Sequence, residues 1–252
     1  DVSWYPDAFI LLNKSKRELT DLEIYKNGEI YIQSLASLVP PLVLDPQPGD
    51  KVLDLTAAPG SKTSQIAAMM NLQGELIAND NNKVRFFKLK HNMELLGVDI
   101  RGNTPWRVTT NVANAWNFVL RMEHGTKLCQ EYPQYFDKIL LDVPCSAEAR
   151  FVEGEPKTYG YWSERKIKEM AYKQRQLLLS AWQALKPGGT LVYSTCTFAP
   201  EENEMQISRL LERNPDAEML EVKIEGLKTI QALKEWKGKI FRPEVSKAIR
   251  IM

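Results

Sequence analysis

Short apolar runs alternate with longer amphipathic segments along residues 51–213. The apolar runs predict strands at 52–55, 75–78, 108–110, 138–141 and 190–193. Segments with apolar residues at every third or fourth position predict helices at 61–70, 82–96, 163–185 and 201–213. Strands that alternate with helices are typical of an α/β fold with a doubly wound, mostly parallel sheet.

Prolines and glycines mark the boundaries of these elements. Residues 1–45 mix aromatic and charged residues, and we interpret Pro40-Pro41 as breakers before a new element, followed by Pro46, Pro48 and Gly49. The pattern predicts a small N-terminal cap at 1–45 and one main domain at 46–252. Because the sequence opens on Asp1 rather than Met, we expect it to begin inside a longer protein or after processing.

The composition is that of an ordinary globular protein. The 252 residues are 44% hydrophobic and 26% charged, which excludes disordered, collagen-like and coiled-coil classes. No apolar run approaches the roughly 18 residues that a membrane span needs, so we expect no membrane association. With 33 Lys and Arg against 32 Asp and Glu, only local patches can argue for an anionic partner. Residues 223–252 are such a patch, with eight Lys and Arg against three Glu, although a solvated surface explains them equally well.

The few cysteines and histidines limit the possible chemistry. Cys129, Cys145 and Cys196 form no CxxC pair, so we expect neither a disulfide framework nor a structural zinc, but free thiols in a reducing compartment and a cytoplasmic protein. His91 and His124 are the only histidines. They make metal catalysis and Ser/His/Asp hydrolysis improbable, and we expect no metal.

The turn after the first predicted strand has the composition of a ligand-binding loop. Residues 56–63, TAAPGSKT, place small side chains where a backbone must approach a ligand. They match neither the phosphate-binding GxxxxGK[ST] loop nor the dinucleotide motif GxGxxG, which favours a smaller nucleoside cofactor. Asp80 follows Gly60 by 20 residues, where an acidic side chain accepts hydrogen bonds from a ribose. A helix N-cap is the alternative interpretation of Asp80.

Two cysteines follow the carboxyl ends of predicted strands. Cys145 and Cys196 are therefore expected at the sheet edge that holds the ligand, whereas Cys129 is expected to be a buried hydrophobic residue. Two thiols beside a nucleoside cofactor suit methylation of a pyrimidine at carbon-5, because a thiolate that adds to carbon-6 makes carbon-5 nucleophilic. The stretch DVPC at 142–145 lacks the tandem prolines and aromatic residue of amino-group methyltransferases. These residues alone leave the roles of the two thiols exchangeable.

Five motifs in this order resemble those of the Nop/Sun-type (RsmB/NOP family) RNA cytosine carbon-5 methyltransferases. They are DLTAAPGSKT at 54–63, AND at 78–80, DVPCS at 142–146, YSTC at 193–196 and PEENE at 200–204. The resemblance covers about residues 28–213. It implies a Rossmann-like class I methyltransferase domain at 46–252, with 1–45 as a cap or the remnant of an RNA-binding extension.

The resemblance also implies a cofactor and roles for individual residues. S-adenosylmethionine would be the methyl donor, with Cys196 as nucleophile and Cys145 assisting breakdown of the covalent adduct, although DNA cytosine methyltransferases use the Pro-Cys thiol as nucleophile. Asp142 would also hydrogen-bond the cytosine edge, and Lys62 would position the base. The residues implied to hold the cofactor are Thr56, Ala57, Ala58, Pro59, Gly60, Ser61, Lys62, Asp80, Arg85, Asn114 and Asp142.

The sequence departs from the family pattern in three places. Ala147 and Ala149 stand where the family often has glycine after Pro-Cys-Ser, so the loop is expected to follow a different path. Asn114 is the best counterpart of an aspartate that contacts the adenine side after the third strand. The sequence ends at Met252, before the family's last glycine-aromatic strand, so that strand is missing from this sequence or the sheet is one strand short.

A basic and aromatic segment gives the local argument for RNA. Residues 150–175 carry seven Lys and Arg against four Glu, interleaved with Phe151, Tyr159, Tyr161, Trp162 and Tyr172. Cations hold phosphates and aromatic faces stack on unpaired bases, but helix packing would explain Trp162 and Tyr172 as well. We expect a monomeric enzyme that makes 5-methylcytosine in RNA, with rRNA favoured over tRNA. The alternatives are an inactive RNA-binding scaffold in ribosome assembly and a small-molecule or protein methyltransferase.

Overall fold

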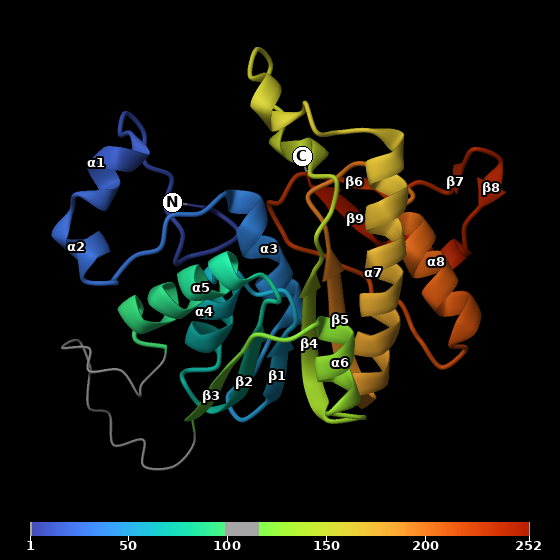
Figure 1. Cartoon of the computed structure of the whole chain (residues 1–252), viewed down its shortest axis with the longest axis horizontal. Coiled ribbons are helices and arrows are strands. Elements are labelled where there is room, and N and C mark those ends of the chain that lie inside the picture. The colour runs from blue at the N-terminus through green and yellow to red at the C-terminus, as the bar shows by residue number, and fades with distance from the viewer. Residues whose placement is uncertain (1, 99–115, 252) are drawn as a thin grey trace. The chain divides into compact units, whose positions relative to one another are not determined.

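The computed structural model describes residues 2–98 and 116–251 (Figure 1). They divide into two compact units. The sheet unit comprises Lys14–Val143 and Leu179–Ser194. The thiol unit comprises the chain up to Asn13, Pro144–Leu178 and the chain from Thr195 onward.

A parallel sheet organises the sheet unit. Its strands are β1 (Lys51–Asp54), β2 (Gly74–Asn79), β3 (Trp116–Arg121), β4 (Phe136–Asp142) and β5 (Leu185–Ser194). Their order is β3-β2-β1-β4-β5 and every neighbouring pair is parallel, with Val52 of β1 opposite Leu76 of β2 and Lys138 of β4. The strand order reverses between β1 and β4, as in doubly wound folds, so the predicted fold class is confirmed.

Helices cover this sheet and build its core. The helices of the sheet unit are α1 (Lys16–Thr20), α2 (Glu23–Lys26), α3 (Leu35–Leu44), α4 (Ser61–Met69), α5 (Lys83–Leu95) and α6 (Gly125–Gln130). Ile66 of α4, Leu89 and Met93 of α5, and Leu76 of β2 are fully buried in one apolar cluster. Accordingly, α4 and α5 lie on the same side of the sheet (Figure 1). Burial of such side chains contributes about 1.5–3 kcal/mol each, which fixes the turns between the strands and these helices.

The thiol unit contains shorter elements around a long helix. They are η1 (Glu148–Arg150), η2 (Pro156–Thr158), α7 (Glu164–Ala184), α8 (Glu204–Arg213), β6 (Thr229–Gln231), β7 (Glu235–Trp236), β8 (Lys239–Ile240), η3 (Pro243–Lys247) and β9 (Ile249–Ile251). The residues of α7 from Leu179 belong to the sheet unit. Antiparallel pairs form between β6 and β9 and between β7 and β8. Leu211, Phe241 and Val245 make a small buried core.

Three sequence-based boundaries need correction or fall outside the structure. The strand predicted at 108–110 lies outside the described residues, and the strand beside β2 is Trp116–Arg121, where Phe118 is buried. Pro40 and Pro41 do not break the chain but lie inside α3, because the apolar side chains of that helix are buried and compensate for the missing N–H donors. The helix predicted from 201 begins at Glu204, after a turn.

No helix in the described parts of the chain is both long enough and apolar enough to cross a membrane.

Candidate functional site

The loop between β1 and α4 turns sharply at Gly60. Gly60 has φ of +111°, and an added Cβ would lie 2.6 Å from Cε of Met93 and 3.1 Å from Cδ1 of Leu89. Only glycine adopts this backbone conformation without strain and leaves room for α5. Ala57 and Ala58 are buried, and Ala57 N–H donates to the carbonyl of Asn79 at 2.8 Å. The loop is therefore fixed to the ends of β1 and β2.

Asp80 and Arg85 meet beside this loop. Asp80 is only 3% exposed, and its carboxylate accepts the N–H of Asn82 at 2.9 Å and pairs with Arg85 at 3.3 Å. Arg85 also donates to the carbonyl of Ala58. The side chain that caps α5 is Asn82, which accepts the N–H of Arg85 at 3.0 Å. Asp80 thus supports the helix start without being its cap, and its role toward a ribose stays a prediction.

Asp54 is a buried carboxyl group that the sequence analysis did not single out. It is 1% exposed, and Oδ2 accepts the hydroxyl of Thr63 at 2.7 Å. No partner for Oδ1 exists among the described residues. Burial raises the pKa of Asp54 to about 7. Its place at the carboxyl end of β1 was the signal in the sequence, because ligands of such sheets lie at that edge.

Lys62 and Asp142 form the polar centre of the same edge. Lys62 Nζ lies 2.7 Å from Asp142 Oδ2 and donates to the hydroxyl of Ser37 at 3.1 Å. Ser194, the last residue of β5, donates to Asp142 Oδ1 at 2.7 Å, and Thr56 donates to the Asp142 carbonyl at 2.7 Å. The Asp142 carboxylate is therefore held by side chains of α4 and β5, and its backbone carbonyl by Thr56 after β1. Ser194 stands in the motif YSTC at 193–196, whereas Ser37 carried no signal in the sequence.

In the thiol unit, the two predicted cysteines are in contact. The Sγ atoms of Cys145 and Cys196 lie 3.2 Å apart, and the N–H of Cys196 donates to Sγ of Cys145 at 3.4 Å. The hydrogen bond with Cys196, together with burial, raises the pKa of Cys145. Either sulfur can donate the hydrogen bond that joins the two thiols. Cys129, by contrast, is 2% exposed, and burial raises its pKa to about 12.

The Cys145 segment is held by buried polar groups. Ser146 and Thr197 share a hydrogen bond of 2.7 Å, and the N–H of Ser146 donates to Glu202 at 3.1 Å. Gln174 of α7 donates both to Glu202 at 2.6 Å and to the carbonyl of Pro144 at 2.9 Å. The chain then passes through Ala147 at φ of +59°, a left-handed conformation that favours glycine. Ala147 thus holds a conformation that glycine adopts with less strain, and the different path expected for this loop stays a prediction.

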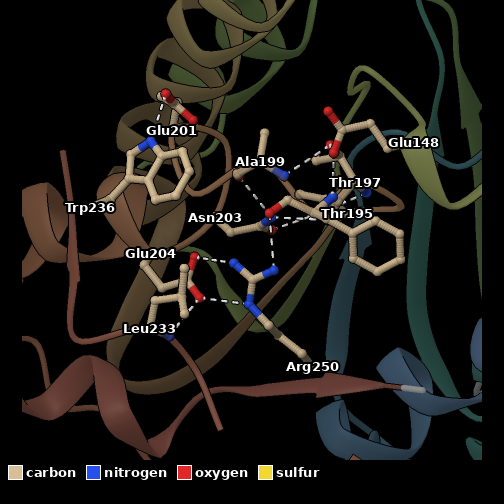
Figure 2. Close-up of polar contacts among 11 residues, drawn as sticks. Glu148, Thr195, Thr197, Ala199, Glu201, Asn203, Glu204, Leu233, Trp236 and Arg250 are labelled. Carbon is tan, nitrogen blue, oxygen red and sulfur yellow. Dashed lines mark hydrogen bonds and ion pairs between the residues drawn. The ribbon is translucent and has the colours of Figure 1, made fainter. Parts of the chain in front are cut away.

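A second network holds the turn after Cys196 (Figure 2). Asn203 donates to the carbonyls of Thr197 and Ala199, both at 3.0 Å, and accepts the hydroxyl of Thr195 at 2.7 Å. Glu204, 3% exposed, receives two hydrogen bonds of 2.8 Å from Arg250 of β9. Asn203 therefore links the side chain of Thr195, before the cysteine, to the backbone of Thr197 and Ala199 after it.

Comparison with known proteins decides the family. Residues 41–247 match the sequence model of the family described as 16S rRNA methyltransferase RsmB/F. The chain belongs to this family. The resemblance drawn from the sequence motifs is thereby confirmed.

Several RsmB/F relatives are similar over most of this chain. A tRNA (cytosine(49)-C(5))-methyltransferase of Pyrococcus abyssi is 39% identical over 90% of this chain and 66% of its own length. A ribosomal RNA small subunit methyltransferase F of Pectobacterium atrosepticum is 36% identical over 86% of this chain and 42% of its own length. NSun6 from Pyrococcus horikoshii, whose crystal structure was determined with SFG, aligns with a TM-score of 0.68 and 32% identity, covering 84% of this chain and 49% of NSun6. The chain thus spans less than two thirds of each.

The RsmB/F fold brings most of the predicted cofactor residues to one sheet edge. Thr56, Lys62 and Asp142 are linked by hydrogen bonds or ion pairs, and so are Ala58, Asp80 and Arg85. Pro59, in the same loop, accepts a hydrogen bond from Asn92 of α5 at 2.8 Å. Ser61 begins α4, and its hydroxyl lies 3.4 Å from that of Ser37.

Asn114 lies outside the described residues, so its proposed contact with the cofactor is untested. Residues Trp116–Phe118, which lie beyond the strand predicted at 108–110, form part of β3 itself. The residue that follows β3 and contacts the end of β2 is Glu123, whose N–H donates to the side chain of Asn79 at 3.0 Å. His124 then begins α6 as its N-cap. Glu123 and His124 therefore follow the carboxyl end of β3, the edge where ligands of such sheets lie, and the sequence pattern did not place them there.

Proposed function

We propose that this RsmB/F family member methylates carbon-5 of a cytosine in RNA, with Cys196 as the nucleophile. The contact of 3.2 Å between the thiols of Cys145 and Cys196 carries this proposal. When one thiol of such a pair is deprotonated and the other is not, a nucleophile and a proton donor lie side by side. An inactive scaffold or a methyltransferase for another substrate class has no use for such a pair.

The sheet unit fits S-adenosylmethionine as the methyl donor. SFG, found with the related NSun6, is an analogue of this cofactor. The loop at 56–62 and Asp80 with Arg85 would hold the adenosine part, and Asp142 the donor end. The buried Oδ1 of Asp54, which lacks a partner in the described structure, is an acceptor for a polar group of a ligand at this edge. When bound, the cofactor supplies an electrophilic methyl group to carbon-5.

The protein's own residues perform the remaining steps. The Cys196 thiolate bonds to carbon-6 of cytosine, which makes carbon-5 nucleophilic. After methylation the carbon-5 proton must leave to a base as the bond between Cys196 and carbon-6 breaks. We assign to Cys145 the donation of a hydrogen bond to the departing Cys196 sulfur. Asp142 would accept a hydrogen bond from the cytosine edge. Lys62 would orient the Asp142 carboxylate and position the base.

RNA is the substrate class that the relatives' names indicate. The description of the matching family names 16S rRNA, and the name of the relative from Pyrococcus abyssi names tRNA. We therefore take rRNA as the first substrate to test and tRNA as the second. The five aromatic residues singled out at 150–175 are between 36% and 60% exposed, which leaves their faces available to unpaired bases. We expect the protein to act as a monomer and without a metal.

The decisive assay for the reaction uses methyl-labelled S-adenosylmethionine. The protein is incubated with rRNA and, separately, tRNA lacking the modification, and the RNA is digested to nucleosides. We expect the label in 5-methylcytidine. Label on an exocyclic nitrogen, on protein or on a small molecule would contradict the proposal.

A further inference from the structure

Phe198 is an exposed aromatic residue two positions after Cys196. Its side chain is 55% exposed, whereas Thr197 and Ala199 on either side of it are buried. Single exposed apolar residues are common on protein surfaces and need no explanation by themselves. Phe198 differs from such residues in the way its backbone is held.

Charged side chains from two distant elements fix both polar groups of the Phe198 backbone. Its N–H donates to Glu148 Oε2 at 2.9 Å, and its carbonyl accepts a hydrogen bond from Arg250 Nη1 at 3.0 Å. Glu148 comes from η1 and Arg250 from β9, where Arg250 is itself held by Glu204 (Figure 2). Hydrogen bonds to ionised groups are about twice as strong as neutral ones. The ring of Phe198 is thus attached to a rigid backbone.

The same carboxylate of Glu148 holds a second exposed aromatic side chain. Glu148 Oε1 accepts the indole N–H of Trp162 at 2.7 Å, while Oε2 accepts Thr197 Oγ1 at 3.0 Å and the N–H of Phe198. Trp162 is 40% exposed, so its polar atom is satisfied within the protein while much of its ring faces solvent. Glu148 therefore connects two exposed rings to the loop of Cys196.

The segment that carries Trp162 has a net charge that suits single-stranded RNA. Residues 150–175, which include Trp162, carry seven Lys and Arg against four Glu, a net charge of 7 − 4 = +3. Proteins bind unpaired nucleic acid by combining cationic contacts to the backbone with aromatic faces that stack on bases. A rigid aromatic face loses little conformational entropy when a base covers it.

We propose that Phe198 and Trp162 form a stacking surface for an unpaired RNA base next to the target cytosine, with Glu148 as the positioning residue. This inference rests on the proposed function, because Cys196 defines the target. The two rings would contribute affinity for unpaired RNA without selecting a particular base.

Binding of a uridine oligoribonucleotide with one cytidine tests the proposal. A 2-aminopurine placed beside the cytidine reports stacking by fluorescence quenching. We expect Phe198→Ala and Trp162→Ala each to raise the Kd by about 5- to 100-fold and to reduce the quenching. The slope of log Kd against log salt should not change, because no phosphate contact is lost.

Ring-retaining variants separate stacking from structural damage. Phe198→Trp enlarges the ring and should bind within about threefold of the parent. Trp162→Phe keeps a ring but removes the hydrogen bond to Glu148, so its Kd should lie between those of the parent and Trp162→Ala. Phe87→Ala removes a phenylalanine of similar exposure, 54%, from α5 and should not change the Kd. Thermal unfolding of each variant checks that it is folded.

The same preparations distinguish the two proposals. If the parent transfers methyl groups to RNA cytosine but both alanine variants bind and quench like the parent, the stacking surface is wrong and the proposed function stands. If ring-retaining and alanine variants lose binding equally, the residues are structural and the stacking proposal is also wrong. If the parent methylates no RNA cytosine, both proposals fail.

Discussion

Lys62 Nζ and Asp142 Oδ2 form an ion pair of 2.7 Å that joins the first turn of α4 to the last residue of β4. We expect Lys62→Met to lower kcat/KM for RNA methylation by about 100- to 1,000-fold, as for loss of one preorganised charged donor. The free energy of unfolding should change by only about 1 kcal/mol, since the pair is partly exposed. Steady-state methylation and urea unfolding measure the two effects.

A matched ion pair in the same unit provides the control for Lys62. Lys186 lies 2.6 Å from Asp137, and both are near the starts of their strands rather than at the ligand edge. Lys186→Met should therefore leave kcat/KM within about threefold of the parent. Equal losses of activity in both variants would show that Lys62 has no special role.

The turn at Gly60 makes a prediction about stability. Gly60→Ala places a Cβ 2.6 Å from Met93 Cε at φ of +111°, so we expect it to lower the free energy of unfolding by about 2–4 kcal/mol. Gly97 also has a positive φ, +69°, but its added Cβ would meet nothing within 4 Å. Gly97→Ala should therefore cost only about 1 kcal/mol. Similar losses measured by urea unfolding would refute close packing at Gly60.

Replacing Ala147 with glycine, which the family often has after Pro-Cys-Ser, should stabilise the protein. Its φ of +59° strains an alanine, so Ala147→Gly is expected to raise the free energy of unfolding by about 0.5–1 kcal/mol. Ala149, in η1, is the control because its backbone φ is not positive, and Ala149→Gly should lower stability by a similar amount. A loss of stability in both variants would argue against strain at Ala147. Thermal unfolding distinguishes the signs.

The buried Asp54 should make the free energy of unfolding depend on pH. Burial raises the pKa of Asp54 to about 7, whereas an unfolded aspartate titrates near pH 4, at about 3.9. At a pH between these two pKa values, the folded protein therefore holds a proton that the unfolded chain has released. This contribution is complete below about pH 4 and disappears as the pH rises through about 7, with a slope of at most about 1.4 kcal/mol per pH unit. Urea unfolding over this range should show that Asp54→Asn lacks this decline, and parallel curves for the two proteins would contradict it.

Local patterns in the sequence were sufficient for β1, β2, β4 and β5, but not for β3. Periodicity and turn composition revealed the apolar runs of β1, β2 and β4 and the small residues before Ser61. These features depend only on neighbours close in sequence. The same rules misjudged Pro40 and Pro41, because burial of α3 outweighs their poor fit to a helix. Tertiary burial of this kind leaves no trace in a local pattern.

The supports of the thiol pair could not be predicted because they link distant segments. Glu148 reaches Phe198 across 50 positions, and Arg250 reaches Glu204 across 46. A glutamate or an arginine at such positions looks like an ordinary surface residue until the fold brings its partner near. The order of the two thiols in the reaction is likewise absent from the sequence pattern. The structure adds that the two sulfur atoms are in contact, and either of them can donate the hydrogen bond between them.

Trapping of a protein–RNA adduct tests the central claim most directly. Parent, Cys145→Ala and Cys196→Ala proteins are incubated with S-adenosylmethionine and unfractionated RNA and separated on denaturing gels. The account predicts that an adduct accumulates with Cys145→Ala, because release is slowed, and is absent with Cys196→Ala, because carbon-6 has no nucleophile. An adduct that forms with Cys196→Ala and not with Cys145→Ala would contradict the assignment of Cys196 as nucleophile.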